Sequence, residues 1–195
     1  MKGTKLKFVH KRKDFIKLNG WAEIVSAATR EEKNLLFQPV DKLYEIARDE
    51  RIILALDERD SLVGSVVLWD IGDEWNEVGT VYVSPEYRGR GVGQEILQQA
   101  FVMWNGQKIM STSKNSLFIH IAVKSGMIAV SSEYDMCKVV PLTCVCGESD
   151  GVADPGRCPF RDKECVFLIS NATAQGMRCC ERMDKIVQSA IKYSQ

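Results

Sequence analysis

Alternating apolar and polar residues mark the strands expected in the first half of the chain. The stretch KLKFVHK, residues 5–11, alternates and predicts a strand near the start. The stretch RIILALDERDSLVGSVVLWD, residues 51–70, predicts two strands around the polar turn DERDS. The stretch NEVGTVYV, residues 76–83, predicts a third strand, so the three together are expected to form a meander.

Helices are expected between the first strand and this meander. Residues 14–50 are predicted to be mostly helical, with Asp14 as the cap of one segment. Thr29 and Glu32 have the spacing of a capping box. The stretch PVDKLYEIARDE, residues 39–50, starts with proline, which fits the first turn of a further helix.

The second half of the chain is expected to mix strands and helices as well. The run SLFIHIAV is almost continuously apolar, which is typical of a strand covered on both faces. The polar, glycine-containing stretch 146–163 is expected to be a loop. The expected elements are strands over 116–123, 137–144 and 164–170, a short helix over 125–136 and a last helix over about 173–193. This order favours an α/β (α+β) fold in a single domain, 1–195 (core about 4–170), whose mixed, mostly antiparallel central sheet has helices on both faces.

Composition narrows the classes of function. The 195 residues are 45% apolar and 27% charged, as in a soluble globular protein. Because 26 basic residues balance 26 acidic ones, there is no global field to attract nucleic acid or an anionic membrane. The N-terminus lacks the apolar run of a secretory signal, and no stretch reaches the ~18 apolar residues of a membrane span. We therefore expect a cytoplasmic protein, monomeric or homodimeric, without nucleic acid or membrane as a partner.

The stretch EYRGRGVGQE, residues 86–95, places three glycines and two arginines at a predicted strand-to-helix corner. The helix after it, about 91–105, has a predicted buried face. The residues of that face are Leu97, Ala100, Phe101 and Trp104. A helix start has N–H groups without intrahelical partners, and glycines let the backbone come close to a ligand. The corner therefore predicts an anion site, most naturally for phosphate, where the arginines can reach a second phosphate. A tight turn with solvated arginines is the structural alternative.

Three other patterns fit this corner less well. A nucleotide-triphosphate loop needs a lysine followed by serine or threonine, which is absent here. A dinucleotide fingerprint needs a third small residue, but the sequence from Gly89 reads GRGVGQ. An arginine-glycine RNA-binding segment would be repetitive, whereas this one is single and flanked by regular structure.

The hexapeptide RGRGVG, residues 88–93, resembles the [Q/R]-x-x-G-x-[G/A] motif of the GNAT acetyltransferases. The wider stretch VYVSPEYRGRGVGQEIL resembles the strand, loop and helix around that motif. The resemblance implies acetyl-CoA or another acyl-CoA as the donor, its pyrophosphate on the amides of residues 89–94 and its pantetheine paired with the preceding strand. It also implies that this strand splays from the next parallel strand. The implied cofactor-binding residues are Val81, Tyr82, Val83, Arg88, Gly89, Arg90, Gly91, Val92, Gly93 and Gln94.

Acyl transfer from a thioester to an amine needs a base, an oxyanion donor and an acid. The amine must lose a proton, because an alkylammonium has a pKa near ~10. The resemblance implies the Val83 N–H as the oxyanion donor. It also implies Glu77, eleven residues before Arg88, as the general base, whose pKa apolar neighbours would raise. A solvated Glu77 is the alternative, with Glu74 or an ordered water chain as the substitute base.

Tyr134 is the candidate acid for the leaving thiolate. The stretch EYDM, residues 133–136, resembles the L-Y-E-K stretch of the family's second CoA-facing helix. The family has asparagine seven and alanine four residues before this tyrosine, and a glycine-aromatic pair four and five residues after it. This sequence has Met127, Val130, Lys138 and Val139 at those positions. A core tyrosine is the alternative, and His120, in its expected strand, is a weaker candidate for substrate contact.

The cysteines form a separate feature. Their number, seven, is odd, and there is no export signal, so reduced thiols fit better than disulfides. Cys144, Cys146, Cys158 and Cys165 bracket the expected loop and could hold a tetrahedral zinc ion. Their spacing is not a standard C-x-x-C pair, so free thiols are the favoured interpretation and zinc the minority hypothesis.

The sequence therefore favours an acyl-CoA-dependent N-acetyltransferase that works by direct transfer in a ternary complex. The acceptor is open among small amines, amino acids, aminoglycoside-like compounds, peptide N-termini and protein lysines. Its specificity is expected to lie in the helices over 14–50 and the loop 146–163. A non-catalytic acyl-CoA-binding or sensing module is the alternative, favoured by the altered surroundings of Tyr134. An RNA-binding protein is a third, weaker class.

Overall fold

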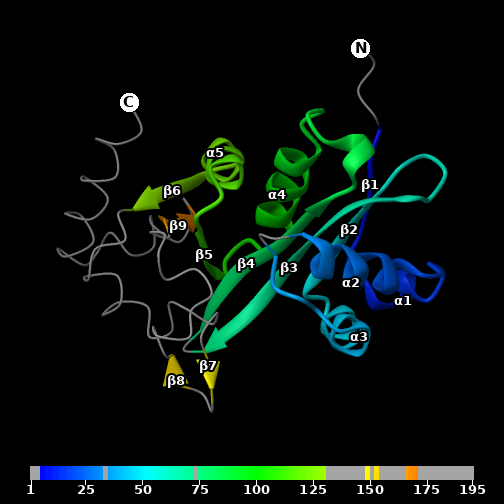
Figure 1. Ribbon diagram of the computed structural model, residues 1–195, viewed down its shortest axis with the longest axis horizontal. Helices are drawn as coiled ribbons and strands as arrows, with labels where there is room; N and C mark the ends of the chain where they lie inside the picture. The colour runs from blue at the N-terminus through cyan, green and yellow to red at the C-terminus, as the bar shows by residue number, and fades with distance from the viewer. Residues whose placement is uncertain are drawn as a thin grey trace. The chain divides into compact units, whose positions relative to one another are not determined.

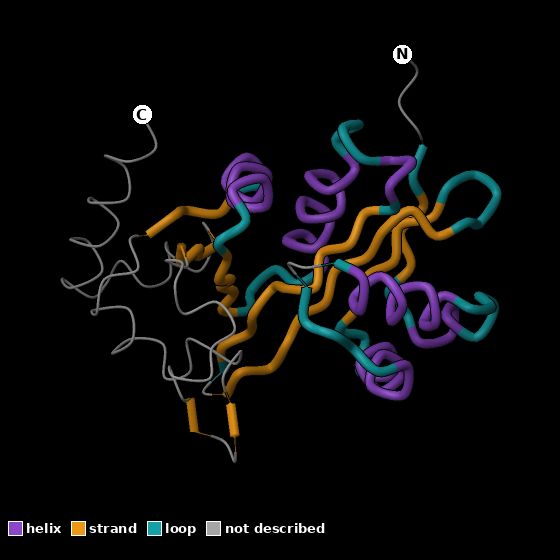
Figure 2. Tube along the Cα trace, in the orientation of Figure 1, coloured by secondary structure: helices purple, strands orange, loops and turns teal. Residues whose placement is uncertain are grey.

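The computed structural model describes residues 5–32, 35–72, 74–130, 148–149, 152–153 and 166–170. The helices are α1 (Arg12–Phe15), α2 (Trp21–Glu31), α3 (Val40–Arg48), η1 (Pro85–Tyr87, a 3-10 helix), α4 (Val92–Met103) and α5 (Ser116–Lys124) (Figure 1). The strands are β1 (Lys7–Val9), β2 (Ile52–Leu56), β3 (Leu62–Gly72), β4 (Trp75–Val83), β5 (Lys108–Ser113), β6 (Met127–Val130), β7 (Glu148–Ser149), β8 (Val152–Ala153) and β9 (Val166–Ser170) (Figure 2).

Seven of these strands form one sheet in the order β1-β2-β3-β4-β5-β9-β6. Strand β2 pairs antiparallel with β1 and β3, and β9 pairs antiparallel with β5 and β6. Strands β4 and β5 are parallel. The predicted mixed, mostly antiparallel sheet is thus confirmed, as are the strand at the start of the chain and the meander β2–β4.

The chain divides into two compact units, which are described separately. The first comprises Met1–Trp69 and Val78–Met103, and the second comprises Asp70–Glu77 and Trp104–Gln195. Strand β4 contributes residues 78–83 to the first unit and residues 75–77 to the second.

In the first unit, helices α1, α2 and α3 cover one face of the sheet (Figure 1). All five residues of β2 are buried, and side chains at alternate positions point to opposite faces. Ile52, Leu54 and Leu56 belong to a core cluster that also contains Trp21 and Leu43. This cluster fixes the three helices on the sheet by burying their apolar sides.

Helix α4 packs on the other face of the same strands (Figure 1). Its residues Ile96, Leu97 and Ala100 are buried. Gly64 of β3 allows this approach, because a Cβ there would lie 2.5 Å from the Tyr82 carbonyl oxygen and 2.7 Å from Ile96 Cδ1. The predicted helix after the corner and the predicted cover of both faces are therefore confirmed in this unit.

The expected helix caps in residues 14–50 are wrong in two places. Asp14 lies inside α1 rather than at its cap. Thr29 lies inside α2 and is buried, and its hydroxyl accepts a 2.9 Å hydrogen bond from the Gln38 N–H. The buried hydroxyl therefore holds the segment that follows α2 and does not cap the start of a helix. Helix α3 begins at Val40 directly after Pro39, as predicted.

In the second unit, β5, β9 and β6 carry helix α5. The run 116–123 was expected to be a strand, and the structure shows that it is this helix. The side-chain oxygen of Asn115 accepts hydrogen bonds from the N–H groups of Leu117 (3.0 Å) and Phe118 (3.3 Å). This N-cap satisfies the first amides of a helix, which the apolar character of the run did not reveal.

Two further elements of this unit differ from expectation. No strand was predicted over Lys108–Ser113, yet β5 lies inside the sheet with Ile109, Met110 and Ser111 buried. The helix expected over 125–136 is contradicted by strand β6 at Met127–Val130. The predicted strand over 164–170 is confirmed by β9.

Residues 148–153 lie in the stretch expected to be a loop. Two short strands pair there, β7 with β8, joining Glu148 to Ala153 and Ser149 to Val152. The expected strand over 137–144 and the expected last helix over 173–193 lie outside the described residues.

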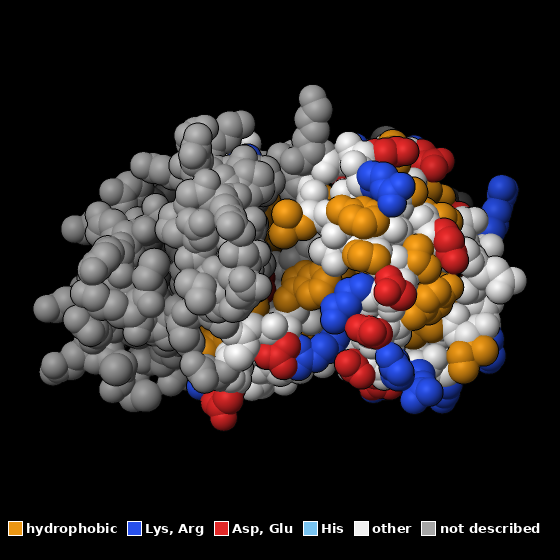
Figure 3. Space-filling model, turned by 60° about the horizontal axis from the view of Figure 1, so that its bottom comes forward, with side chains coloured by type: hydrophobic (Ala, Val, Ile, Leu, Met, Phe, Trp, Pro, Cys, Tyr) orange, Lys and Arg blue, Asp and Glu red, His pale blue; other side chains and the backbone are white. Residues whose placement is uncertain are grey.

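The segment of the first unit from α1 to α3 carries apolar side chains at its surface. Among the described residues, the large exposed ones in this region are Ile16, Ile24, Leu36, Phe37 and Tyr44. Figure 3 shows apolar side chains among acidic and basic ones on the described part of the face in view. Arg30 lies over the Phe37 ring, 4.6 Å from its centroid. The segment 14–50 thus offers mixed apolar and charged contacts, in a region where acceptor specificity was expected.

Candidate active site

The glycine corner lies in the first unit, between the end of β4 and the start of α4. The chain passes through η1 and then through Gly89 (φ 72°) and Gly91 (φ 82°) before α4 begins at Val92. Both φ values lie in the left-handed region, which glycine adopts without strain. Apart from the glycine itself and its two neighbours in the chain, no described protein atom lies within 4 Å of a Cβ built at either position. The corner is therefore an open cradle in which glycine leaves room for a ligand to approach the backbone.

The start of α4 faces this corner. The first helical hydrogen bond here runs from the Glu95 N–H to the Gly91 carbonyl, at 3.0 Å. N–H groups at the start of a helix point toward its N-terminal end and carry partial positive charge. Val92 is buried and Gly93 half-buried, so the side chain at 92 anchors the turn while the backbone forms its surface. This geometry suits a phosphate group.

Arg88 is held by protein partners. Its Nε donates a 3.0 Å hydrogen bond to the Val83 carbonyl, and its Nη2 pairs with the Glu32 carboxylate, just after α2. The sequence suggested that both arginines extend toward phosphate. In the structure Arg88 joins the end of β4 to the end of α2, whereas the Arg90 guanidinium lies 5.6 Å from the centre of the Tyr87 ring.

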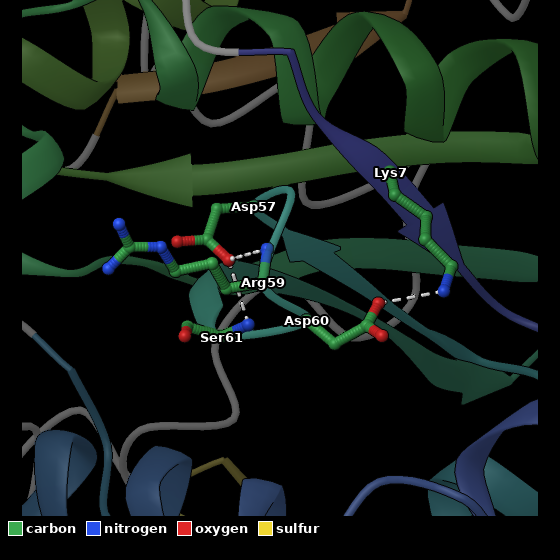
Figure 4. A network of polar contacts seen from close by, with 5 residues as sticks. All are labelled: Lys7, Asp57, Arg59, Asp60 and Ser61. Carbon is green, nitrogen blue, oxygen red and sulfur yellow. Dashed lines mark hydrogen bonds and ion pairs between the residues drawn. The ribbon is translucent and has the colours of Figure 1, made fainter.

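A second contact fixes the corner to the turn between β2 and β3. The Tyr87 hydroxyl donates a 2.9 Å hydrogen bond to Asp57, which raises the pKa of Tyr87. The hydrogen bond from the Ser61 N–H, and after it the one from Tyr87, lowers the pKa of the Asp57 carboxyl. Asp57 also accepts hydrogen bonds from the N–H groups of Arg59 (2.8 Å) and Ser61 (2.9 Å), and Figure 4 shows both. In the same view Lys7 pairs with Asp60 at 2.8 Å. The corner thus rests on a turn that has its own hydrogen-bond network.

Strand β4 presents the residues expected to pair with pantetheine. Tyr82 is buried, and Val81 and Val83 are half-buried. The residue before them, Thr80, has φ 49°, a left-handed value inside a strand. Sequence reasoning missed this irregularity, although a glycine at position 79 is a recognised sign of one.

Glu77 belongs to the second unit and lies opposite Met110 in the parallel pairing of β4 with β5. Its Oε1 accepts hydrogen bonds from the Thr112 hydroxyl (2.8 Å) and the Thr112 N–H (3.3 Å). Burial raises the pKa of the Glu77 carboxyl, and the hydrogen bonds from Thr112 lower it in part. A carboxylate with a raised pKa takes up a proton more readily, so Glu77 has the character expected of a general base.

Glu74, the substitute base named from the sequence, has a different environment. Its carboxylate pairs with Lys108 Nζ at 2.8 Å and is largely exposed. The hydrogen bond from Lys108 lowers the pKa of the Glu74 carboxyl. Glu74 is therefore a weaker proton acceptor than Glu77.

Tyr134 lies outside the described residues, so its role as the acid stays a prediction. The helix expected to carry it is absent at 127–130, and α5 occupies residues 116–124 instead. Asn115 and Gly126 flank α5 at the offsets of the family's asparagine and glycine. With that spacing the tyrosine position falls on Ala122, which is fully buried. The asparagine cap is the signal that would have identified this helix from the sequence.

The remaining candidates have no structural support in the described part of the chain. His120 lies on α5 with an exposed side chain, not in a strand. Cys144, Cys146, Cys158 and Cys165 lie outside the described residues. Within the described ranges, no group of three or more His, Cys, Asp or Glu side chains could hold a metal ion. Among the described helices, none has the length and apolar character needed to span a membrane.

Several solved structures share this fold. N-acetylglutamate synthase from Neisseria gonorrhoeae, complexed with coenzyme A and N-acetyl-glutamate, has a TM-score of 0.56 and 14% identity over 87% of this chain and 35% of its own. A Mycobacterium tuberculosis protein in complex with CoA has a TM-score of 0.53 and 17% identity over 84% of this chain and 98% of its own. Diaminobutyrate acetyltransferase from Paenibacillus lautus, with its substrate and coenzyme A, has a TM-score of 0.50 and 17% identity over 86% of this chain and 96% of its own.

The chain spans about a third of the N-acetylglutamate synthase chain, so that enzyme is larger than the shared fold. A sequence comparison with curated proteins found no match. A family comparison did: residues 18–109, which include helices α2 to α4 and strands β2 to β4, match the acetyltransferase (GNAT) family. The sequence motif at the corner, the strand order and this match agree, and they support assigning residues 18–109 to the GNAT acetyltransferase family.

Proposed function

We propose that this protein is an N-acetyltransferase that transfers an acetyl group from acetyl-CoA to a primary amine by direct attack in a ternary complex. The glycine corner carries the proposal. Two glycines with left-handed φ values form an open cradle at the start of α4, directly after strand β4. The amides of residues 89–94 would hold the pyrophosphate of the donor, with the pantetheine along Val81, Tyr82 and Val83.

The carboxylate of Glu77 would supply the general base. It removes one proton from the bound alkylammonium, and the free amine then attacks the thioester carbonyl carbon. The N–H of Val83 would stabilise the resulting oxyanion. Collapse of this intermediate breaks the C–S bond, and the nitrogen loses its second proton. The products are therefore the N-acetylated amine, coenzyme A as its thiolate and two protons, one of which is held by Glu77. The raised pKa of Glu77 supports this role, because the group must accept a proton from a much weaker acid.

The leaving thiolate can take its proton in two ways. Tyr134 is the proposed donor: its hydroxyl would give its own proton to the thiolate, and the phenolate would regain one of the two protons that the nitrogen released. Ala122 occupies the tyrosine position of the helix that the structure describes, and an alanine has no proton to give. A thiol with an ordinary pKa near ~8.5 leaves acceptably as a thiolate, so water is a sufficient donor if Tyr134 is not used.

Release of CoA tests the proposal. The protein is incubated with acetyl-CoA and a panel of a polyamine, free amino acids, an aminoglycoside and a lysine-containing peptide. We expect thiol release that requires one class of amine, with a single acetyl group on its nitrogen by mass spectrometry. If acetyl-CoA does not bind in calorimetry and no thiol is released with any amine, these results contradict the assignment.

Ala122 favours a second candidate, a non-catalytic acyl-CoA-binding or sensing module. The two candidates give different results in the same pair of measurements. A sensing module binds acetyl-CoA with saturable heat but releases no CoA with any amine. An enzyme shows both, so binding without turnover across the whole panel would favour the sensing module.

A further inference from the structure

Strand β4 contains a residue in an unfavourable backbone conformation. Thr80 has φ 49°, which places a β-branched residue in the left-handed region. Such residues adopt this region rarely, because the Cβ approaches the following carbonyl oxygen. A left-handed residue also reorients the peptide planes on either side of it, so the groups that follow point differently from those of a regular strand. Neighbouring groups must therefore hold Thr80 in place.

Trp69 of strand β3 supplies those contacts. Its indole Nε1–H donates a hydrogen bond to the Thr80 hydroxyl oxygen at 3.3 Å. The indole also lies over Gly79, where a Cβ would come within 3.2 Å of the Trp69 Cδ1 atom and 3.3 Å of its Nε1 atom. A Cβ at position 79 would require the ring to move by a few tenths of an ångström, so the glycine leaves the space that the indole occupies.

The other side of Trp69 connects to the core. The ring is partly buried and packs against the core cluster, whose residues come from α1, α2 and α3 and from strands β1, β2 and β3. A ring anchored in this way has few alternative positions, because core side chains are closely packed. The conformation of Thr80 is thus set by a side chain outside its own strand.

We propose that Trp69 is a positioning residue for the donor site. Its indole holds Thr80 in the left-handed conformation and thereby directs the backbone groups of Val81, Tyr82 and Val83 toward the pantetheine of acetyl-CoA. The binding role of these three residues rests on the proposed function. The contact of Trp69 with Thr80 lies within the first unit, so its effect on the backbone can be measured without a ligand.

A set of four variants tests this inference. Trp69→Phe keeps an aromatic ring but removes the N–H donor. Thr80→Gly lets the backbone adopt φ 49° unaided, so the double variant no longer needs the indole. Trp21→Phe is the matched control, because Trp21 is a core residue of the same unit whose indole N–H has no hydrogen-bond partner among the described residues.

We expect Trp69→Phe to weaken acetyl-CoA binding by about three- to tenfold in calorimetry, the range of one lost hydrogen bond. Thr80→Gly should bind within about twofold of the wild type, and adding Trp69→Phe to it should change nothing further, since coupled residues are non-additive. Trp21→Phe should lower Tm without changing the affinity. Equal losses from Trp69→Phe with and without Thr80→Gly would overturn the proposal.

Amide hydrogen exchange of residues 81–83 gives a ligand-free readout. It should be faster in Trp69→Phe than in the wild type, but equal in Thr80→Gly and the double variant. If the wild type does not bind acetyl-CoA, the proposed function fails while this measurement still decides whether Trp69 holds the strand. Unchanged exchange in Trp69→Phe would refute that hold.

Discussion

The glycine corner and the Glu77 site, the two parts of the proposed active site, are built by different means. At the corner the backbone would form the binding surface, and Gly89 and Gly91 set its shape through left-handed φ values. At the Glu77 site a side chain would be the functional group, and the Thr112 hydroxyl from another strand donates a hydrogen bond to it. The corner is open at its glycines, whereas the carboxyl of Glu77 is shielded enough for burial to raise its pKa.

This difference shows which changes each region tolerates. The corner depends on local backbone conformation, so side chains can vary except where they add a Cβ at a positive φ. Glu77 depends on the exact functional group and on its surroundings, so even an isosteric change removes its chemistry. The comparison predicts that corner variants lose donor affinity and Glu77 variants lose turnover.

The largest effect is expected from Glu77→Gln. Loss of a general base lowers the rate by about 10²–10⁴-fold, while affinity for acetyl-CoA should stay nearly intact. The change should not lower Tm near neutral pH. Because the pKa of Glu77 is raised in the folded state, ionisation of its carboxyl lowers the stability of the wild type as the pH rises through that pKa, and the neutral Gln side chain avoids this loss. Steady-state kinetics with the identified amine measure this. Glu74→Gln is the matched control and should keep its rate; the reverse result would move the base to Glu74.

The second effect is expected at Gly91. Gly91→Glu adds a Cβ at φ 82° and a negative charge where phosphate would bind, so acetyl-CoA affinity should fall by at least about tenfold, or 1.4 kcal/mol. Gly106→Glu is the matched control, because Gly106 also has a left-handed φ (87°) but lies outside the corner. Calorimetry on both folded variants decides this. Equal affinity of Gly91→Glu and wild type would refute the donor site.

A smaller effect is expected from the contact between Glu32 and Arg88. If Arg88 acts by joining the end of β4 to α2, Glu32→Gln should weaken acetyl-CoA binding by about threefold, the scale of an exposed ion pair. If Arg88 instead binds phosphate directly, releasing it from Glu32 should leave affinity equal or higher. Titration calorimetry at low and moderate salt separates the two. Arg88→Lys, which keeps the charge but not the fork, should match Glu32→Gln in the first case.

The smallest effect concerns pH. The Thr112 hydroxyl stabilises the Glu77 carboxylate, so Thr112→Val should raise the pKa of Glu77 further. Since the base must be deprotonated, the acidic limb of the kcat/KM profile should then move to higher pH, by less than about one unit. Ser113→Ala, on the same strand, should leave the limb in place. A shift to lower pH in Thr112→Val would show that the hydroxyl does not act on this carboxylate.

The sequence predicted most of the first unit correctly because its signals there are local. Strands β1 to β4 alternate or are bounded by turns, and α4 repeats apolar residues such as Leu97 and Ala100 at helical spacing. Local signals failed in the second unit. Helix α5 is apolar enough to resemble a buried strand, and only its Asn115 cap distinguishes it. Strand β5 carries serines and a threonine, which gave no sign of a central strand. In the structure such polar side chains find partners inside the sheet, as when the Thr112 hydroxyl donates to Glu77.

The sequence by itself determined the corner, since the end of a strand, three glycines and a helix start follow one another directly in the chain and need no distant partner to predict an anion site. Only the tertiary structure decided how the functional groups are held. Arg88 meets Glu32 from a segment far away in the chain, and Trp69 holds Thr80 in a conformation that threonine does not favour. The pKa of Glu77 follows from burial and from Thr112. These properties depend on which side chains become neighbours, and folding brings together residues whose spacing along the chain carries no sign of the contact.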